Sequence, residues 1–467
     1  MSFFASSPNT VMSHNVIRFR VTLAVIAFGA TIAPPQTAST QNASDPLGTI
    51  VAEAVRNNLA IAQERLAEQS AAANLREARG RFLPSLSIAS RYSKLREPLD
   101  LGEFVNPAYA ALNQVIGENR FPTNLSLTLP FAHESRVRLT QPVFDASIAA
   151  GFSASRHARD AQHHQRRGAT RRIAAQAQTA YLDVATARNA RKIWAATLEL
   201  VTESERVATR LVDAGRATPD ALFRARADRS DVEQRLAEAR DQEDAAIRAF
   251  NQLLRRPLAA PVEEIADTAL RFELRMTEEE AIARALERRE ELAQASAGVR
   301  AGEARVRLAT ASFMPNVAIA VDYGVQGSAL RFDGDDDFAV ASVVLSWNVF
   351  NGGQDVARRH GAQADAERLR LRRAELEDLV RLDVSRAYRA AVVGRDAIVT
   401  ADAGLAAARR NFELVRRRYE EGLATQIEFL DARTALTSAE LNRVITMYRY
   451  AIRCVDLERA SALREID

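Results

Sequence analysis

The feature that most constrains this chain is an internal repeat, because two copies of one plan are expected to fold alike. Ungapped comparison at an offset of 231 pairs Val51 with Ile282, Pro84 with Pro315 and Tyr92 with Tyr323. A second match pairs LTQPVFD (139–145) with LSWNVFN (345–351), and a third pairs the glycines Gly215 and Gly422. These matches keep the same order in both halves, which a chance likeness between helices would not do. We therefore expect two structural repeats, 34–270 and 271–467.

Each repeat contains two segments that alternate like β-strands. The expected strands cover 84–93 and 136–144 in the first repeat, and 315–326 and 338–350 in the second. The third strand presents an apolar face that consists of Val317, Ile319, Val321 and Tyr323, and the second strand presents Arg136 and Arg138 on its polar face. Period-two alternation indicates a sheet with one apolar face. The alternative is a half-buried strand in a soluble sandwich, but the chain offers no second sheet to cover that face.

Such a sheet predicts an oligomer. Four strands cannot close a barrel by themselves, and an open sheet edge is not tolerated in lipid. Two chains would supply about eight strands, and side chains would fill the interior of a barrel of that size. Three chains would supply about twelve strands and leave room for a pore. If the apolar face lies in a membrane, several copies must complete the barrel, with the apolar side chains facing lipid and Arg136 and Arg138 facing the lumen.

The rest of the chain is predicted to be helical. The expected helices cover 47–83, 146–214 and 219–255 in the first repeat, and 278–313, 354–421 and 425–464 in the second. The two long segments contain no proline, and at 1.5 Å per residue each gives a helix of roughly 100 Å. The shorter helices are about half as long, so a pair of them stacked end to end matches one long helix. We expect a mainly α-helical protomer built from long helical hairpins.

The sequence also predicts how each hairpin turns. Before the second turn, apolar residues step by three and four along a heptad seam that is typical of coiled coils: Leu405, Ala408, Phe412, Val415 and Tyr419. Gly422 and its equivalent Gly215 follow, which suits a helix end in the left-handed conformation. Thr425 and Thr218 are then expected to cap the next helix, and Pro219 suits its first position.

The N-terminus predicts export. Arg18 and Arg20 precede the apolar run VTLAVIAFGA (21–30), a pattern typical of a signal peptide, which we place at 1–33. Removing it lowers the formal charge from +3 to +1, so charge does not point to nucleic acid. The one cysteine, Cys454, excludes a disulfide framework, and none follows the signal to carry a lipid. We expect an exported, unlipidated chain without membrane-spanning helices.

Catalytic and metal chemistry are poorly supported. His163 and His164 are adjacent, so on a helix they point in different directions and make a weak metal site. The NGG at 351–353 lacks a lysine at phosphate-loop spacing and fits a strand-to-helix turn. No nucleophile, base and orienting group stand out. We predict no enzyme activity, no cofactor and no metal.

Taken together, LPSLSIASRY, LTQPVFD, VFNGG and YEEGLATQIEFLDAR, on a repeated plan behind a signal peptide, resemble the TolC family of outer-membrane efflux proteins. The resemblance covers about 47–464. It implies a homotrimer with a twelve-stranded barrel in the outer membrane and a helical tunnel in the periplasm. It also implies two partners, a periplasmic adaptor (membrane fusion) protein and an inner-membrane pump or ABC transporter. Export of small toxic molecules is the expected function.

Two alternatives stay open at this point. The same channel could serve type I protein secretion, with protein as cargo. A periplasmic adaptor or coiled-coil scaffold also uses helical hairpins, but it would have one hairpin and soluble β-domains.

The resemblance assigns roles to particular residues. It places an acidic constriction of the periplasmic entrance at Glu428 and Asp431, with Tyr419 as a latch residue. The adaptor-facing tips would be formed by Gly215, Thr218, Gly422 and Thr425. The chain departs from the family at Ala424, where the best-known member has a gating arginine. It also departs in the long connection 94–135, where PAYAALNQVIGEN suits a short helix, and NLSLTLPFA either extends the second strand or forms an extra hairpin that caps the outer mouth.

Overall fold

The computed structural model describes residues 46–94, 99–126, 128–129, 133–266, 272–274, 276–327 and 336–464. All of them belong to one compact unit, Asp45–Asp467. The predicted signal peptide, 1–33, lies outside the described residues. Within the described ranges, no helix combines the length and the hydrophobicity that crossing a membrane requires.

Both repeats follow the order helix, helix, strand, strand, long helix, helix, and the first carries an insertion between its strands. The first repeat consists of α1 (Pro46–Asn57), α2 (Leu59–Gly80), β1 (Ser85–Tyr92), β4 (His133–Phe144), α4 (Ala146–Asp213) and α5 (Pro219–Leu254). Its insertion holds β2 (Leu99–Asp100), α3 (Gly102–Ile116) and β3 (Thr128–Leu129). The second repeat consists of α6 (Glu278–Arg288), α7 (Glu290–Ala311), β5 (Asn316–Gly327), β6 (Asp337–Ser346), α8 (Gln354–Glu420) and α9 (Gln426–Ala460).

The helices predicted as single pieces over 47–83 and 278–313 are each divided in two. The breaks fall at Asn58 and Arg289, which are themselves 231 positions apart and have nearly the same extended backbone (φ −69°, ψ 129° and φ −66°, ψ 127°). Asn58 accepts a hydrogen bond from Ala60 N–H and so caps α2, whereas Arg289 makes no side-chain cap. The duplicated backbone therefore keeps a bend that neither proline nor glycine marks in the sequence.

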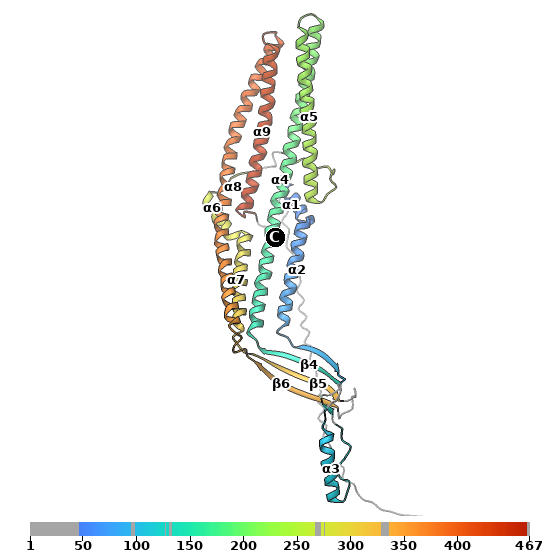
Figure 1. The fold of residues 1–467 in the computed structure, drawn as a ribbon. Coiled ribbons are helices and arrows are strands. Elements are labelled where there is room, and N and C mark those ends of the chain that lie inside the picture. The colour runs from blue at the N-terminus through green and yellow to red at the C-terminus, as the bar shows by residue number, and fades with distance from the viewer. Residues whose placement is uncertain are drawn as a thin grey trace, which may run out of the picture. The chain divides into compact units, whose positions relative to one another are not determined.

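The four long strands form one antiparallel sheet in the order β1-β4-β5-β6 (Figure 1). The two repeats meet at the central pair, β4 and β5. Only β1 and β6 lie at the edges, so each presents one row of backbone groups without a partner strand among the described residues. The insertion forms a separate ladder between β2 and β3.

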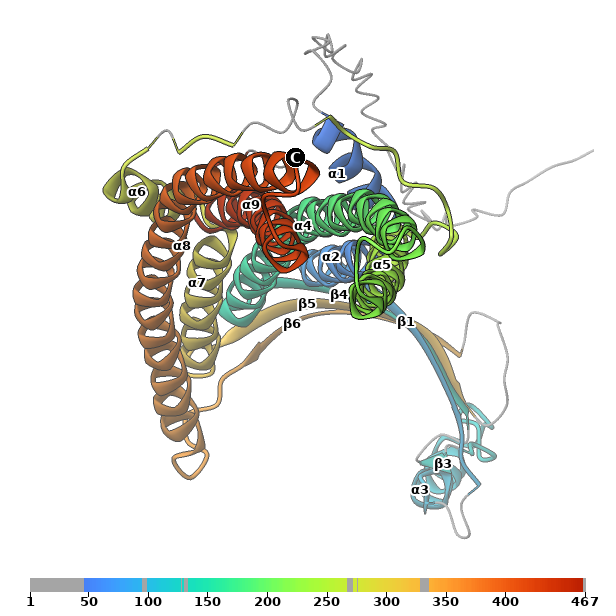
Figure 2. The same ribbon diagram turned by 90° about the horizontal axis from the view of Figure 1, so that it is seen from above.

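The long helix α4 packs against helices of both repeats, namely α2, α5, α7 and α9, and α8 packs against α6, α7 and α9 (Figure 2). One apolar core joins α1, α2, α4, α5 and α9 around Tyr181, Phe250 and Tyr448, which are each at most 2% exposed. A second core joins α6, α7, α8 and α9 around Val380 and Val384. Helices from both repeats are therefore bound into one body by buried apolar side chains.

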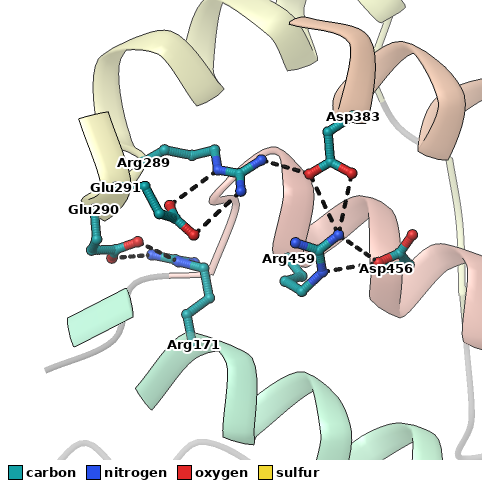
Figure 3. A network of polar contacts seen from close by, with 7 residues as sticks. All are labelled: Arg171, Arg289, Glu290, Glu291, Asp383, Asp456 and Arg459. Atoms are coloured by element: carbon teal, nitrogen blue, oxygen red, sulfur yellow. Dashed lines mark hydrogen bonds and ion pairs between the residues drawn. The ribbon is translucent and has the colours of Figure 1, made fainter. Parts of the chain in front are cut away.

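A network of ion pairs also crosses between the repeats (Figure 3). Arg171 of α4 forms two hydrogen bonds of 2.7 and 2.8 Å with the carboxylate of Glu290 of α7, and both side chains are more than 90% buried. Arg289 donates to Asp383 of α8 at 2.7 Å, and Arg459 of α9 lies 3.5 Å from the same carboxylate. The Arg171–Glu290 pair is buried so deeply that it contributes little net stability, but removing one partner leaves the other charge uncompensated.

Candidate functional site

The two hairpin tips have the same backbone geometry. At the first tip, Gly215 N–H donates to Val212 C=O (2.9 Å) and the next amide to Leu211 C=O (2.8 Å). At the second, Gly422 N–H donates to Tyr419 C=O (3.0 Å) and the next amide to Arg418 C=O (2.7 Å). Gly215 and Gly422 have φ of +65° and +74°, the left-handed region where a side chain costs about 1–2 kcal/mol. Glycine thus permits both chain reversals.

The caps that follow these turns differ. Thr425 and Glu428 form a capping box, in which Thr425 Oγ1 accepts from Glu428 N–H at 3.2 Å and Glu428 Oε2 accepts from Thr425 N–H at 2.6 Å. Thr218 occupies the corresponding cap position with extended backbone, but its side chain makes no cap hydrogen bond. The predicted threonine cap is therefore absent at the first tip, where Pro219 supplies the helix start through its fixed φ.

Glu428 and Asp431 both lie exposed in the first turns of α9. The hydrogen bonds from the backbone and side chain of Thr425 lower the pKa of Glu428, so its carboxylate stays charged at neutral pH. The Glu428 side chain is already held by the cap, whereas Asp431 forms no hydrogen bond or ion pair with any other described residue. The two carboxylates are three positions apart and therefore lie on the same face of α9.

Tyr419 is half-buried within the second hairpin and does not project freely from it. Its ring stacks on Phe429 (4.9 Å between centroids, 21° between planes), and Phe429 also contacts Phe412. Burial raises the pKa of the Tyr419 hydroxyl, so it stays protonated as a hydrogen-bond donor. An aromatic cluster of Phe412, Tyr419 and Phe429 therefore stiffens the second hairpin just behind its tip.

Sequence reasoning missed a polar contact between the two hairpins. Arg433 of α9 is 5% exposed and donates from Nη2 to Asp228 Oδ1 of α5 at 2.7 Å. Nearer the tips, Gln426 Nε2 donates to the Ala221 carbonyl at 3.0 Å. The repeat drew attention to this position only in part, because Arg433 matches Arg226 in the first repeat. Arg226, however, pairs within its own hairpin, with Glu205 at 3.3 Å.

The sheet separates polar from apolar side chains as its register dictates. One row across the four strands consists of Leu86, Leu139, Val321 and Ala341, and the next consists of Ile88, Val137, Tyr323 and Ala339. On this face Ile319, Val321 and Tyr323 are 43%, 40% and 56% exposed, and Val317 is partly buried.

On the opposite face Arg138 makes two hydrogen bonds with Asp322, at 2.6 and 2.8 Å, and Arg136 lies 3.5 Å from Glu134. Gly324 is required beside Arg136, because a Cβ there would lie 2.3 Å from the Ser135 carbonyl oxygen. The arginines expected on the polar face are thus held by carboxylates of the same face.

The motifs that were set aside have structural roles. His163 Nδ1 lies 2.8 Å from Glu68 Oε1, and the described residues contain no group of histidine, cysteine and carboxylate side chains suited to a metal ion. Gly352 and Gly353, with φ of +69° and +82°, lead into α8, and Gly353 is its N-cap. The segment is a turn between sheet and helix.

Comparisons with known proteins find similarity in both sequence and fold. The chain is 32% identical over 188 residues to Protein CyaE of Bordetella pertussis, a match that covers 40% of this chain and 38% of that protein. A membrane protein from Pseudomonas aeruginosa matches the fold with a TM-score of 0.75 at 21% identity, over 90% of this chain and 94% of that one. The outer membrane protein VceC from Vibrio cholerae matches with a TM-score of 0.72 at 17% identity, over 89% and 96%.

The predicted fold class, a mainly α-helical duplicated protomer with a small sheet, is confirmed by these fold matches. The model of one family, the outer membrane efflux proteins, matches residues 50–254 and 281–462, which correspond to the two repeats. The resemblance and the outer-membrane location expected from sequence are thereby confirmed, and the family and fold are those of channels. The chain belongs to the outer membrane efflux protein family.

Proposed function

We propose that this chain is the outer-membrane outlet of a tripartite export system and a passive conduit for small toxic molecules. The observation that carries the proposal is the four-stranded sheet, which has two unpaired edges and one continuous apolar face. Channels of this family form trimers and work with adaptor and pump components. Three copies joined edge to edge, β6 to β1, would leave no open edge and enclose a lumen of about twelve strands.

In this assembly the face with Val317, Ile319, Val321 and Tyr323 contacts lipid, and Arg136 and Arg138 face the lumen. Ile319→Arg should destabilise the inserted barrel by roughly 2–4 kcal/mol if it lies near the bilayer midplane. Ala318→Arg, on the opposite face of the same strand, is the matched control. Heat-modifiable oligomers should be lost in the first variant and kept in the second. Equal assembly of both variants would place the strand outside the membrane.

The two hairpin tips, with Gly215, Thr218, Gly422 and Thr425, form the adaptor-facing end in this proposal. Gly422→Val forces a β-branched residue into the left-handed region, which distorts the tip while leaving the sheet untouched. Gly404→Val lies in the helical part of the same hairpin, where a Cβ meets no other atom within 4 Å. We expect export to be lost only in the Gly422 variant, with normal barrel insertion in both. Full resistance to toxic compounds in the Gly422 variant would argue against docking at the tip.

Glu428 and Asp431 are proposed to line the periplasmic entrance, where three copies would supply up to six carboxylates, with Tyr419 as the latch beside them. A ring of this kind favours cations and binds polyvalent cations that block the pore. Replacing both acids with alanine should reduce cation selectivity and block by trivalent cations in planar-bilayer recordings. Glu413→Ala, an exposed acid on α8, is the control. Unchanged selectivity and block in the double variant would remove these residues from the entrance.

The cargo is tested in cells. Deleting the gene should sensitise the host to small toxic compounds, and the wild-type chain should restore resistance. Loss of a secreted protein with unchanged drug resistance would instead assign the channel to type I secretion. Extraction by carbonate wash separates either outlet from a periplasmic scaffold, because only an inserted barrel remains with the membrane.

A further inference from the structure

The insertion between β1 and β4 forms a small unit of its own around α3. Asn113, which is 7% exposed, bonds the returning chain three times: its Nδ2 donates to Phe121 C=O (2.7 Å), and its Oδ1 accepts from the amides of Arg120 (3.0 Å) and Phe121 (2.8 Å). Asn106 exchanges two further hydrogen bonds with the backbone of Leu125, at 2.7 and 2.9 Å. These bonds fix which side of the helix faces the returning chain.

Close packing supports the same orientation. The ring of Tyr109 lies 5.3 Å from that of Phe121, and a Cβ at Gly102 would lie 1.9 Å from the Leu125 carbonyl oxygen. At 100° per residue, Gly102, Asn106, Tyr109 and Asn113 share one side of α3. This side is occupied by the segment that returns toward β4.

The opposite side of α3 is an apolar stripe, which consists of Phe104, Pro107, Ala108, Ala111, Leu112 and Val115. All of these residues are exposed, with Val115 at 85%, Phe104 at 69% and Leu112 at 44%. Phe104, Ala108, Ala111 and Val115 step by four, three and four, which is the spacing of a helix–helix seam. A contiguous apolar surface of this kind on an ordered element marks an interaction site.

The charges on α3 decide between lipid and protein as its partner. Helices that lie on membranes carry lysine and arginine on their polar side, where they meet anionic headgroups. The only charged residue within α3 is Glu103, and Glu118 and Arg120 follow just after the helix. Because α3 itself carries no lysine or arginine, its uncharged stripe fits another protein surface better than a lipid surface.

The topology supplies that surface. The insertion follows β1, which is an edge strand of the sheet. It leaves the sheet at the end where Tyr92 pairs with His133. The helix α4 begins at the opposite end of the sheet. In the trimer of the proposed function, on which this inference rests, β1 meets β6 of another copy, so α3 lies beside a boundary between copies. Rotation about the trimer axis would bring identical stripes around the same opening.

We propose that the α3 stripe packs against the α3 stripes of the two other copies and forms a three-helix contact over the outer mouth of the channel. Ala108 and Ala111 are small enough for the helices to approach closely, and Phe104, Leu112 and Val115 fill the space between them. Rotational symmetry gives the three helices the same direction along the axis, so identical residues lie at the same level. The contact narrows the outer mouth and holds the three insertions together.

Disulfide crosslinking tests the contact, because two cysteines join only when their Cα atoms lie about 4.4–6.8 Å apart. In a Cys454→Ala background, the test variants are Ala111→Cys and Val115→Cys. The matched control is Ala110→Cys, which changes an exposed alanine one position along the helix, 100° around it from Ala111. After mild oxidation in native membranes, the two stripe variants should yield mostly disulfide-linked dimers, and Ala110→Cys should yield almost none.

Each other outcome counts against the inference. If heat-modifiable trimers form without links at positions 111 and 115, the α3 contact is wrong while the proposed channel stands. Equal linking at positions 110 and 111 would indicate random collision. Quenching of a fluorophore at position 115 by spin-labelled lipids would make lipid the partner. If the unmodified chain forms no trimer, both this inference and the proposed function fail.

Discussion

Phe412 in α8 stands where α4 has Glu205, although the two hairpins share one backbone plan. Phe412 is 6% exposed and belongs to the aromatic cluster with Tyr419 and Phe429. The Glu205 side chain is 17% exposed and lies 3.3 and 3.1 Å from Arg226 and Arg229 of α5. One seam position is thus filled by an apolar ring in one copy and by an ion-paired carboxylate in the other.

The comparison shows what a duplication preserves. Backbone reversal at the tips depends on glycine and hydrogen bonds that both copies keep, whereas the interior of each hairpin accepts different side chains. The second hairpin combines an aromatic cluster with a capping box, and the first has neither. We therefore expect the second hairpin to open less readily than the first. Native-state hydrogen exchange of amides in 198–229 and 405–436 measures each opening free energy separately.

The largest expected effect is that of Phe412→Ala, which removes most of a buried ring. It should lower the opening free energy of the second hairpin by about 3–5 kcal/mol. Glu205→Ala should lower that of the first by less than about 1 kcal/mol, because the side chains of Arg226 and Arg229 are 54% and 40% exposed. Equal losses in the two hairpins would show that the ion pairs of Glu205 stabilise as much as the aromatic cluster.

The second-largest loss of stability is expected for Arg433→Ala. It leaves Asp228, whose side chain is 18% exposed, without its partner, so the second hairpin should lose roughly 3 kcal/mol at its contact with α5. The equivalent change Arg226→Ala removes a side chain that is 54% exposed and should cost less than about 1 kcal/mol. Exchange of amides in α5 reports the contact directly. If both variants behave alike, the contact between hairpins does not stabilise them.

Removing the helix-capping threonines should produce a smaller difference in stability between the two tips. Thr425→Ala removes the cap hydrogen bond to Glu428 N–H and should cost about 1 kcal/mol in the first turn of α9. Thr218→Ala should change the first turn of α5 by a few tenths of a kcal/mol at most, since its side chain makes no cap hydrogen bond. A loss as large at Thr218 as at Thr425 would show that the first tip is capped in solution after all.

The smallest effect is a dependence on pH. The pKa of Glu428 is lowered from its ordinary value of 4.5, mainly by the hydrogen bond from the Thr425 backbone. A lowered carboxyl pKa contributes stability that is complete above pH 4.5 and is lost as the pH falls through the folded-state pKa. Exchange protection at the second tip, relative to the first, should therefore fall in acid. Glu428→Gln should remove this dependence, and if it persists another group is responsible.

Much of the architecture follows from the sequence alone, because local patterns repeat. The strands alternate with a period of two, and the long helices lack proline. Gly215 and Gly422 mark the reversals, where any other residue would be strained. The open edges of a four-stranded sheet likewise follow from the number of strands. These features depend on backbone chemistry and hydrophobic spacing, which a single chain carries in its residue order.

Other features were decided by tertiary structure. The helix breaks at Asn58 and Arg289 carry no glycine or proline signal; they divide helices that pack on both sides of the break against α4 in the first repeat and against α8 in the second. Strand β6 ends at Ser346, short of the predicted residue 350, although apolar alternation continues. Arg433 and Arg226 match in sequence but choose different partners, because a side chain bonds whatever the fold brings near it. Sequence thus determined the repeated plan and its turns, while contacts between distant segments determined the bends and the ion pairs.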